Sequence, residues 1–146
     1  MALPTDTSSS TLVTRVLCVD DNADITEVMR MVIDTEPTMR CVGCLASADH
    51  LVEKVRRMSP LPEVVLLDAT MPGKSPLVAM SELAAAFPEI RTIIYSGHDD
   101  PGFMEQAREA GAWGCVSKND DPSAILHAVR RVTTGNALWA RPLGKT

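Results

Sequence analysis

Three short apolar runs, each ending in an acidic or hydroxyl side chain, most strongly limit the folds open to this chain. The middle run, Val64–Asp68, contains only Val and Leu before its aspartate, as in a strand buried on both faces of a parallel sheet. A buried carboxylate is costly, so Asp68 is expected where the strand leaves the sheet. Residues 16–21 and 93–96 have the same form. Because ligands bind at the carboxyl ends of strands in open α/β sheets, the runs predict a site at one edge.

Strand patterns alternate with helical patterns along the whole chain, at a period of about 25 residues. Such alternation is typical of α/β proteins, in which right-handed crossovers build a parallel sheet covered by helices on both faces. The second strand is less apolar and is expected at an edge of the sheet. The expected strands are residues 15–20, 39–45, 64–68, 91–96 and 113–117, and the expected helices are residues 23–35, 48–58, 76–87, 101–110 and 122–134.

Local motifs predict where several of these helices begin, end and face the sheet. Ser47 is expected to cap the second helix and Ser75 the third, where Pro76 takes the first helical position. Gly111 is expected to end the fourth helix in a left-handed conformation. The predicted inward faces of the first and fifth helices are Ile25, Val28, Met29 and Val32, and Ile125, Ala128, Val129 and Val132.

The length and composition of the chain are those of one ordinary globular domain. It has 146 residues, of which 45% are hydrophobic, and a formal net charge of −5, which argues against nucleic-acid binding by this segment. No apolar run approaches the roughly 20 residues of a membrane helix, and no secretory signal is present. We therefore expect a cytoplasmic protein with no membrane partner. We expect residues 1–14 to be a disordered leader, residues 15–135 the domain, and residues 136–146 a tail or the start of a linker.

Four cysteines fall in or near the predicted strands. Cys41 and Cys44 have the C-x-x-C spacing of a zinc or redox pair, but a structural zinc site needs four ligands and the sequence offers no second pair. We therefore expect these two cysteines, with Cys18 and Cys115, to be reduced, buried thiols that pack as small hydrophobic side chains.

Five polar side chains are expected at the carboxyl edge of the sheet: Asp20, Asp21, Asp68, Ser96 and Lys118. Three carboxylates brought together raise one another's pKa values unless a cation joins them, and Mg²⁺ suits such oxygen ligands. A cationic site that also holds a carboxylate nucleophile suits phosphoryl transfer to that carboxylate. The simpler alternative for the Asp20-Asp21 pair is a structural role, since Asp21 or Asn22 could cap the first helix.

The chain resembles the receiver domains of two-component response regulators, with the CheY-like arrangement of the flavodoxin-like fold. The resemblance covers about residues 14–135. It implies a three-layer (βα)5 sandwich with a five-stranded parallel sheet in the order 2-1-3-4-5. It is carried by Asp20-Asp21, by the run Asp68-Ala69-Thr70-Met71-Pro72-Gly73, by Ser96-Gly97, and by Ala110-Gly111-Ala112 before Lys118.

The resemblance also implies a role for each residue at the edge. Asp68 corresponds to the phospho-acceptor, Asp21 to a direct Mg²⁺ ligand, and Asp20 to the acid that holds a metal-bound water. The backbone carbonyl of Thr70 completes the protein's share of the metal shell. Lys118 is expected to pair with a phosphoryl oxygen.

The expected output of the domain is a change of surface. The Ser96 hydroxyl would turn toward the phosphoryl group and so switch the surface of the fourth helix, fifth strand and fifth helix, through which homodimers form in the family. The expected phosphodonor is a sensor histidine kinase or a phosphotransfer protein. The protein would catalyse only its own phosphorylation and dephosphorylation, and so is not expected to be an enzyme in the usual sense.

The chain departs from the family pattern at two positions near the switch. Cys115 stands where receivers usually carry Tyr or Phe, and strand alternation places Trp113 on the same face as Cys115, where it would substitute for the ring or simply pack against a helix. Asn119 replaces the usual Pro after Lys118. Thr70 and His98 are expected to overhang the acyl phosphate and to affect its lifetime.

The region from Lys118 to Gly135 resembles receivers that precede a helix-turn-helix output domain. Both a stand-alone receiver and a piece of a longer regulator fit the sequence. In a longer regulator, DNA would be a partner only indirectly, through the output domain. Trp139 in the tail would anchor a partner or cover the fifth helix. Two other functions remain as alternatives. One is a pseudo-receiver that binds proteins without phosphate, and the other is a phosphohydrolase, which the presence of Thr70 in place of a second Asp disfavours.

Overall fold

A five-stranded parallel sheet forms the centre of the computed structural model, which describes residues 13–97 and 101–136. The strand order is β2-β1-β3-β4-β5, as the resemblance predicts. Most of the predicted leader, His98 and most of the tail with Trp139 lie outside the described residues. The strands are β1 (Thr14–Val19), β2 (Met39–Leu45), β3 (Val64–Asp68), β4 (Arg91–Ser96) and β5 (Gly114–Ser117), and the helices are α2 (Ala23–Asp34), α3 (Leu51–Arg56), α4 (Pro76–Ala86), α5 (Pro101–Glu109) and α6 (Ser123–Thr133).

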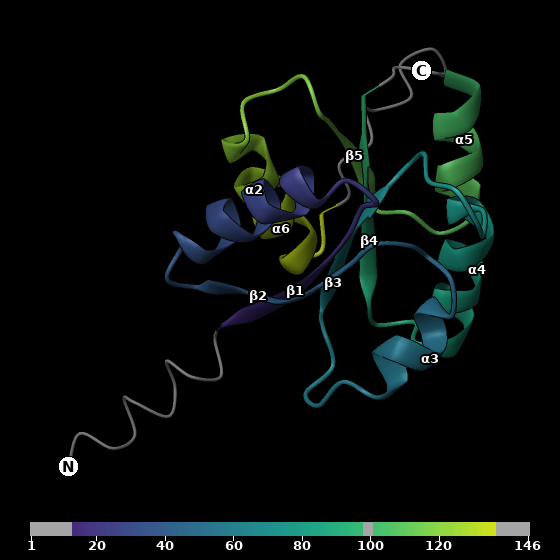
Figure 1. Ribbon diagram of the computed structural model, residues 1–146, viewed down its shortest axis with the longest axis horizontal. Helices are drawn as coiled ribbons and strands as arrows, with labels where there is room; N and C mark the ends of the chain where they lie inside the picture. Colours follow the sequence, from purple (N-terminus) through teal and green to yellow (C-terminus); the bar gives the residue numbers. More distant parts are fainter. Residues whose placement is uncertain (1–12, 98–100, 137–146) are drawn as a thin grey trace.

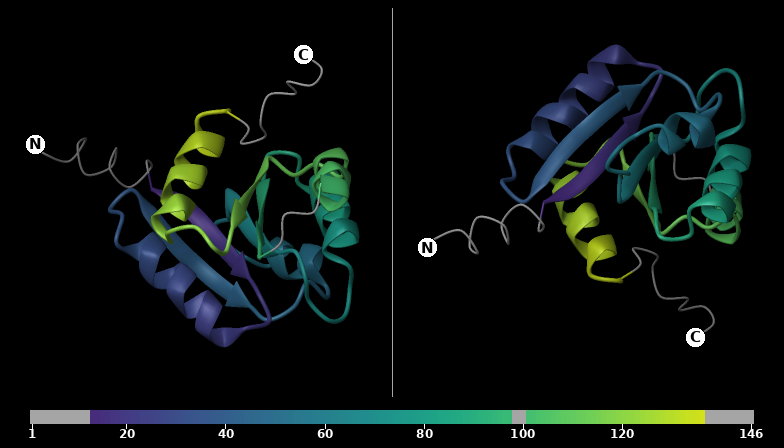
Figure 2. Two further views of the ribbon diagram at one scale, coloured as in Figure 1. Left: turned by 90° about the horizontal axis from the view of Figure 1, so that it is seen from above. Right: turned by 90° about the horizontal axis from the view of Figure 1, so that it is seen from below.

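The helices cover both faces of this sheet and make a three-layer sandwich. Helices α2 and α6 lie on one face, and α3, α4 and α5 lie on the other (Figures 1 and 2). Each layer has its own core, because successive residues of a buried strand point to opposite faces. In β3, Val64 and Leu66 pack toward α2 and α6, whereas Val65 and Leu67 pack toward α3, α4 and α5. The predicted flavodoxin-like fold is therefore confirmed.

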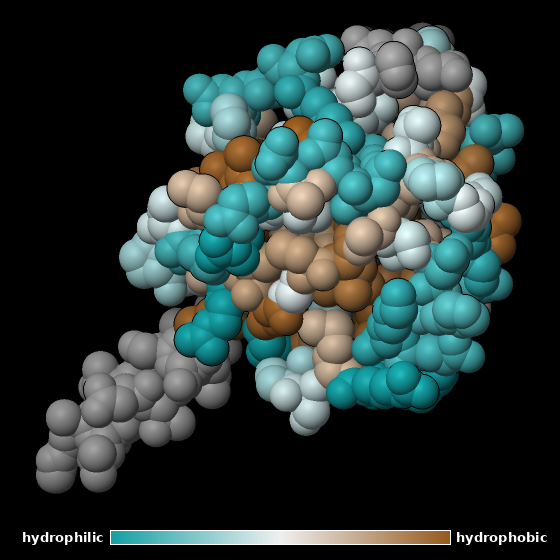
Figure 3. Space-filling view, viewed as in Figure 1, coloured by the Kyte–Doolittle hydropathy of each residue, from teal (hydrophilic) through white to brown (hydrophobic). Residues whose placement is uncertain are grey.

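The distribution of hydrophilic and hydrophobic residues on the surface reflects these three layers. In the view of Figure 3, hydrophilic residues cover the outer sides of the helices, and hydrophobic residues are visible between the two helical layers. All five residues of β3 are buried, as expected for a central strand, while β2 lies at an edge of the sheet and is only partly buried. In the described part of the chain, no helix has the length and apolar character needed to cross a membrane.

Several predicted helix ends and faces are confirmed. The Ser75 hydroxyl accepts a hydrogen bond from the Leu77 amide at 3.2 Å, and Pro76 begins α4. Gly111 follows α5 with a φ of +111°, a conformation that glycine adopts without the usual steric cost. The predicted inner face of α6 is buried in full: Ile125, Ala128, Val129 and Val132.

Three local predictions are wrong. The buried side of α2 is Thr26, Met29 and Ile33, whereas Val28 is 41% exposed, because the helix is rotated from the face that the apolar residues alone suggest. Helix α3 begins at Leu51, since the Ser47 hydroxyl accepts from the Asp49 amide and caps a turn instead of a helix. The fifth strand begins one residue later than expected, at Gly114.

Candidate functional site

The polar residues predicted for the edge of the sheet lie together at the carboxyl ends of the strands. Asp20 follows β1, Asp68 is the last residue of β3, Ser96 is the last of β4, and Lys118 follows β5. The register pairs Asp68 with Tyr95 and Ser96 with Ser117, so β3, β4 and β5 end at the same level. The edge is therefore built by parallel strands that end together.

Lys118 holds two of the carboxylates. Its Nζ lies 2.9 Å from Oδ2 of Asp20 and 3.0 Å from Oδ1 of Asp68. Both acids are buried, with 1% and 3% of their surface exposed, so the ammonium group offsets charge that water reaches poorly. The backbone amide of Lys118 also donates to the Ser96 carbonyl at 2.7 Å, which fixes the start of its side chain beside β4.

The three carboxylates of Asp20, Asp21 and Asp68 converge, with one oxygen atom of each lying within 4.8 Å of the others. Oδ1 of Asp20 accepts from the Asn22 amide at 2.9 Å, and Oδ1 of Asp68 accepts from the Thr70 amide at 3.2 Å. Oδ2 of Asp20 has its ion pair with Lys118 but no directed hydrogen bond within the described part of the chain. Such a buried oxygen, beside two further carboxylates, fits a hard cation with oxygen ligands.

The charges at the edge do not balance without a cation. Three carboxylates face one ammonium group, which leaves an excess of negative charge at a largely buried position. Burial raises the pKa of Asp68 above its ordinary value, although the Lys118 ammonium and the Thr70 amide oppose the change. Burial would lower the pKa of Lys118, but the carboxylates of Asp20 and Asp68 outweigh it and raise that pKa. A divalent cation would relieve the excess charge.

The structural alternative, that Asp21 or Asn22 caps the first helix, is correct for Asn22 and wrong for Asp21. The side chain of Asn22 caps this helix and accepts from the amides of Asp24 at 2.9 Å and Ile25 at 3.3 Å. Asp21 is not the capping residue, and its exposed carboxylate points into the acidic cluster. The cap therefore positions the pair without using either aspartate side chain.

Sequence reasoning missed one residue of the site, Tyr95. The Lys118 Nζ lies 5.6 Å from the centroid of the Tyr95 ring, close enough for a cation–π contact. Tyr95 is 5% exposed and its backbone carbonyl accepts from the Ala69 amide, just after Asp68. Its ring helps to hold the lysine toward the acids. Tyr95 could have been found only from its pairing with Asp68 in the sheet, and a strand pattern in the sequence does not give that register.

The other predicted site residues have different surroundings. Ser96 is buried at the end of β4, and Thr70 is exposed two residues after Asp68. Cys115 packs toward α4 and α5, whereas Trp113 packs toward α6. The expectation that Trp113 and Cys115 share a face is wrong, because Trp113 precedes β5 and does not follow its alternation.

The alternative prediction for Trp113, packing against a helix, is correct. The Trp113 ring lies under the Arg91 guanidinium, 4.4 Å from ring centroid to Cζ, and Arg91 donates to the Val132 carbonyl at the end of α6. All four cysteines are free thiols. The prediction that they are buried is right for Cys18 and wrong for Cys44, which is exposed.

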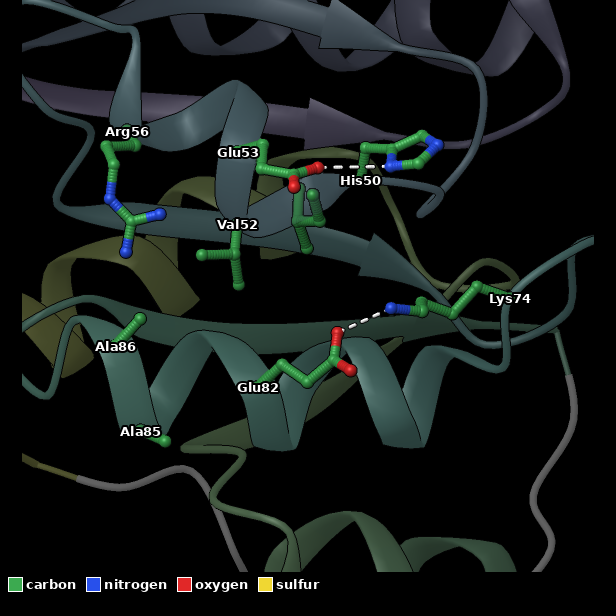
Figure 4. Close-up of a pocket in the computed structure, with 9 residues that line it drawn as sticks. His50, Val52, Glu53, Arg56, Lys74, Glu82, Ala85 and Ala86 are labelled. Atoms are coloured by element: carbon green, nitrogen blue, oxygen red, sulfur yellow. Dashed lines mark hydrogen bonds and ion pairs between the residues drawn. The ribbon is translucent and has the colours of Figure 1, made fainter.

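A groove of about 580 Å³ lies between α3 and α4, away from the acidic edge. Figure 4 shows two polar contacts along it, a hydrogen bond between His50 and Glu53 at 3.0 Å and an ion pair between Lys74 and Glu82 at 2.6 Å. The charged side chains of the groove thus largely satisfy one another. None of the three clustered aspartates lines this groove, so the convergent chemistry belongs to the edge of the sheet.

Comparison with known proteins finds many relatives. Residues 16–130 match the family described as the response regulator receiver domain. The transcriptional activator protein ExaE of Pseudomonas putida is 40% identical over 97 residues, which cover 66% of this chain and 44% of ExaE. The oxygen regulatory protein NreC of Staphylococcus haemolyticus is 30% identical over 122 residues, or 83% of this chain and 55% of NreC. The chain spans about half the length of these curated relatives.

Solved structures agree with this match. A LuxR-family two-component response regulator from Aurantimonas sp. SI85-9A1 superposes with a TM-score of 0.81 and 26% identity, over 91% of this chain and 94% of that one. The response regulator domain of Thermotoga maritima CheB gives a TM-score of 0.68 and 26% identity, over 84% of this chain and 92% of that one.

Proposed function

The chain belongs to the response regulator receiver domain family of two-component systems, and we propose that it accepts a phosphoryl group on Asp68 in a Mg²⁺-dependent reaction. The donor is the phosphohistidine of a sensor histidine kinase or of a phosphotransfer protein. The receiver unit in this proposal spans residues 15–135. The domain is a signalling protein that promotes only its own phosphorylation and dephosphorylation.

The observation that carries the proposal is the contact of one ammonium group with two buried carboxylates. Lys118 lies between Asp20 and Asp68, and Asp21 lies within the same cluster. A structural ion pair needs one acid for one base, whereas this edge gathers three acids and one lysine, which contacts two of them. The excess negative charge supports a cation site beside a carboxylate nucleophile, and so does Oδ2 of Asp20, which has an ion pair with Lys118 but no hydrogen bond among the described residues.

In the proposed reaction, an oxygen of the Asp68 carboxylate attacks the phosphorus of the phosphohistidine. A phosphorus–oxygen bond forms to Asp68, the phosphorus–nitrogen bond breaks, and the imidazole nitrogen leaves with the electron pair. Asp20, Asp21, Asp68 and the backbone carbonyl of Thr70 would hold Mg²⁺. When bound, Mg²⁺ supplies positive charge that offsets the charge of the phosphoryl oxygens.

Lys118 then has a second task in the proposal. Before the reaction its ammonium group pairs with an oxygen of Asp68 that is 3.0 Å away. Once that carboxylate carries the phosphoryl group as an acyl phosphate, the ammonium group would pair with a phosphoryl oxygen instead. The Tyr95 ring contact limits where the lysine can move. Thr70, which is exposed beside the site, and His98 are proposed to affect how water reaches the acyl phosphate.

The output proposed is a change in the surface formed by α5, β5 and α6. Ser96 is buried at the end of β4, one strand from Asp68, and its hydroxyl would turn toward the phosphoryl group. Cys115 lacks the ring that usually follows such a movement, so the change would pass through packing of Cys115 against the α4 and α5 layer. A homodimer through this surface is one proposed consequence.

The further output depends on sequence outside the receiver domain. The relatives ExaE and DegU are named as a transcriptional activator and a transcriptional regulatory protein, and both are about twice the length of the segment that matches. We propose that this domain likewise acts on DNA only through an output domain of a longer regulator.

Mass spectrometry of the intact protein tests the phosphorylation directly. With Mg²⁺ and acetyl phosphate, the protein should gain the mass of one phosphoryl group, and Asp68→Asn should not. Asp24→Asn, an exposed carboxylate close to the edge but outside the cluster, should behave as the wild type. Release of phosphate is measured in parallel, so that a short-lived adduct is detected as Asp68-dependent turnover. If neither the mass gain nor this turnover occurs, a pseudo-receiver is the better reading.

A further inference from the structure

Three of the four cysteines meet on the side of the sheet that α2 covers, away from the acidic edge. We call Cys18, Cys41 and Cys44 the thiol cluster. The Cys41 Sγ lies 3.9 Å from the Cys18 Sγ and 3.9 Å from the Cys44 Sγ, so it is the centre of the cluster. Cys44 also approaches the Thr26 carbonyl of α2 at 3.8 Å. Two strands and one helix therefore surround the three sulfurs.

An irregularity in β2 brings these thiols together. In a regular strand, residues three apart point to opposite faces, so Cys41 and Cys44 would be separated by the sheet. The pairing with β1 shifts between Val16, which faces Cys41, and Leu17, which faces Gly43. Val42 is thus the extra residue of a β-bulge, and Cys44 returns to the face of Cys41. Cys18 of β1 is the register partner of Cys44 and supplies the third thiol.

The environment of the cluster favours thiolate at its exposed end. The Cys18 thiol, followed by Cys41 and the Arg30 guanidinium, lowers the pKa of Cys44 to about 6, although burial and Glu27 oppose this. The pKa of Cys18 is raised, by its neighbours Cys41 and Cys44 and by burial. Cys44 is exposed, Cys41 is half-buried and Cys18 is buried. The cluster therefore has an accessible anionic entrance and a closed inner end.

We propose that the thiol cluster is a binding site for a soft metal ion, namely Cu(I), with Cys18, Cys41 and Cys44 as its three ligands. A metal with bonds of about 2.3 Å to sulfur holds three sulfurs about 4.0 Å apart in a trigonal plane. The two distances from Cys41 are already 3.9 Å, whereas the Cys18 and Cys44 sulfurs lie farther from each other and would have to move closer as the metal binds. Soft thiolates select Cu(I), and structural zinc needs a fourth ligand that this cluster does not include.

Binding releases protons and is helped by a nearby cation. Each thiol that coordinates Cu(I) gives up its proton to solvent, and the metal keeps its oxidation state throughout. Cys44 and Cys41 bind first, because they lie toward the surface, and Cys18 completes the site from below. The Arg30 guanidinium acts electrostatically on both Cys41 and Cys44, so it offsets part of the negative charge that the thiolates bring.

The test is a competition for Cu(I) between the full chain and a coloured Cu(I) chelator such as bathocuproine disulfonate. The protein is kept fully reduced under anaerobic conditions. The wild type should withdraw one equivalent of Cu(I) from the chelator complex. Cys44→Ser and Cys41→Ser should each weaken binding at least about tenfold, since even loss of a residue that only orients a metal ligand costs 10–100-fold.

The fourth cysteine is the matched control. Cys115 packs toward α4 and α5, on the other face of the sheet, so Cys115→Ser should bind Cu(I) as tightly as the wild type. Cys44 is exposed and its replacement leaves the core intact, and the melting temperature of each variant checks this. The proposal is overturned if Cys44→Ser binds Cu(I) as tightly as the wild type, or if Cys115→Ser loses as much affinity as Cys44→Ser. Asp68→Asn should keep full Cu(I) binding, so the outcome does not depend on phosphorylation.

Discussion

Lys118 reaches across β4 from the end of β5, and its Nζ contacts Oδ1 of Asp68 at the end of β3 at 3.0 Å. This contact joins a strand at the edge of the sheet to the central strand. Asp68 is 3% exposed, so its charge depends on this partner while no other cation is bound. The same contact therefore serves the stability of the fold and the proposed chemistry.

Replacing Lys118 with Met should destabilise the fold and make it more responsive to Mg²⁺. The variant keeps most of the side-chain length but leaves Asp20 and Asp68 without their ammonium partner. Breaking a largely buried pair in this way should lower the free energy of unfolding by about 2–4 kcal/mol. Chemical denaturation with and without Mg²⁺ measures this, and Mg²⁺ should restore more stability to the variant than it adds to the wild type.

The control for this variant is Lys74→Met. Lys74 pairs with Glu82 at 2.6 Å on the surface, where Glu82 is exposed and Lys74 is half-buried. Such a pair contributes less than about 1 kcal/mol, and its loss should be independent of Mg²⁺. Equal stability of Lys118→Met and the wild type would contradict the view that the lysine offsets buried charge.

Asn22→Ala should loosen the start of α2 and, with it, the acidic pair. The Asn22 side chain accepts from the amides of Asp24 and Ile25, and an alanine leaves both donors without this partner. We expect a loss of about 1 kcal/mol in the free energy of unfolding. Asn22→Ser retains a capping oxygen and should lose less than half of that amount. If the two variants are equally destabilised, the cap is not what holds this helix end.

Gly73→Ala should disturb the loop that follows Asp68. Gly73 has a φ of +93°, and an added Cβ would lie 2.9 Å from Oδ1 of Asp49. That carboxylate accepts from the Lys74 amide at 2.8 Å, so a shift of Asp49 also weakens this bond. We expect a loss of about 2–3 kcal/mol, measured by denaturant unfolding, from the unfavourable φ and the lost hydrogen bond.

Gly135→Ala separates the cost of the unfavourable φ from the cost of displacing Asp49. Gly135 has a φ of +88°, and an added Cβ there would contact no atom of the described residues within 4 Å. The cost should therefore be that of the backbone conformation alone, about 1 kcal/mol. A Gly73 variant that loses no more than the Gly135 variant would show that Asp49 moves aside freely.

The fold and much of the candidate site could be predicted because strand ends are visible in sequence. The run before Asp68 has no polar residue until its last position, so both the strand and its end are clear. The residues after the other strands then fall at the same edge, since parallel strands share direction. Asp20, Ser96 and Lys118 are found there for that reason.

Relations across strands could not be predicted in the same way. The contact of Tyr95 with Lys118 depends on the register between strands, which no local pattern states. The face of Trp113 was misjudged because the strand begins one residue later than expected. The exposure of Cys44 and its place beside Cys41 depend on a bulge at Val42, and that bulge is a property of the pairing of β2 with β1.

Cys44 should react with iodoacetamide at a lower pH than an ordinary cysteine. The thiolate is the reactive form, and the lowered pKa of about 6 means that the thiolate dominates at neutral pH. In a Cys115→Ser background, the alkylation rate of Cys44, followed by peptide mass spectrometry, should rise through pH 6 and level off by about pH 7. In the same protein unfolded in urea, the rise should move to about pH 8.5. Cys18→Ala and Arg30→Gln should each move the folded profile to higher pH, since both partners lower this pKa. A folded profile that matches the unfolded one would remove the cluster as the cause.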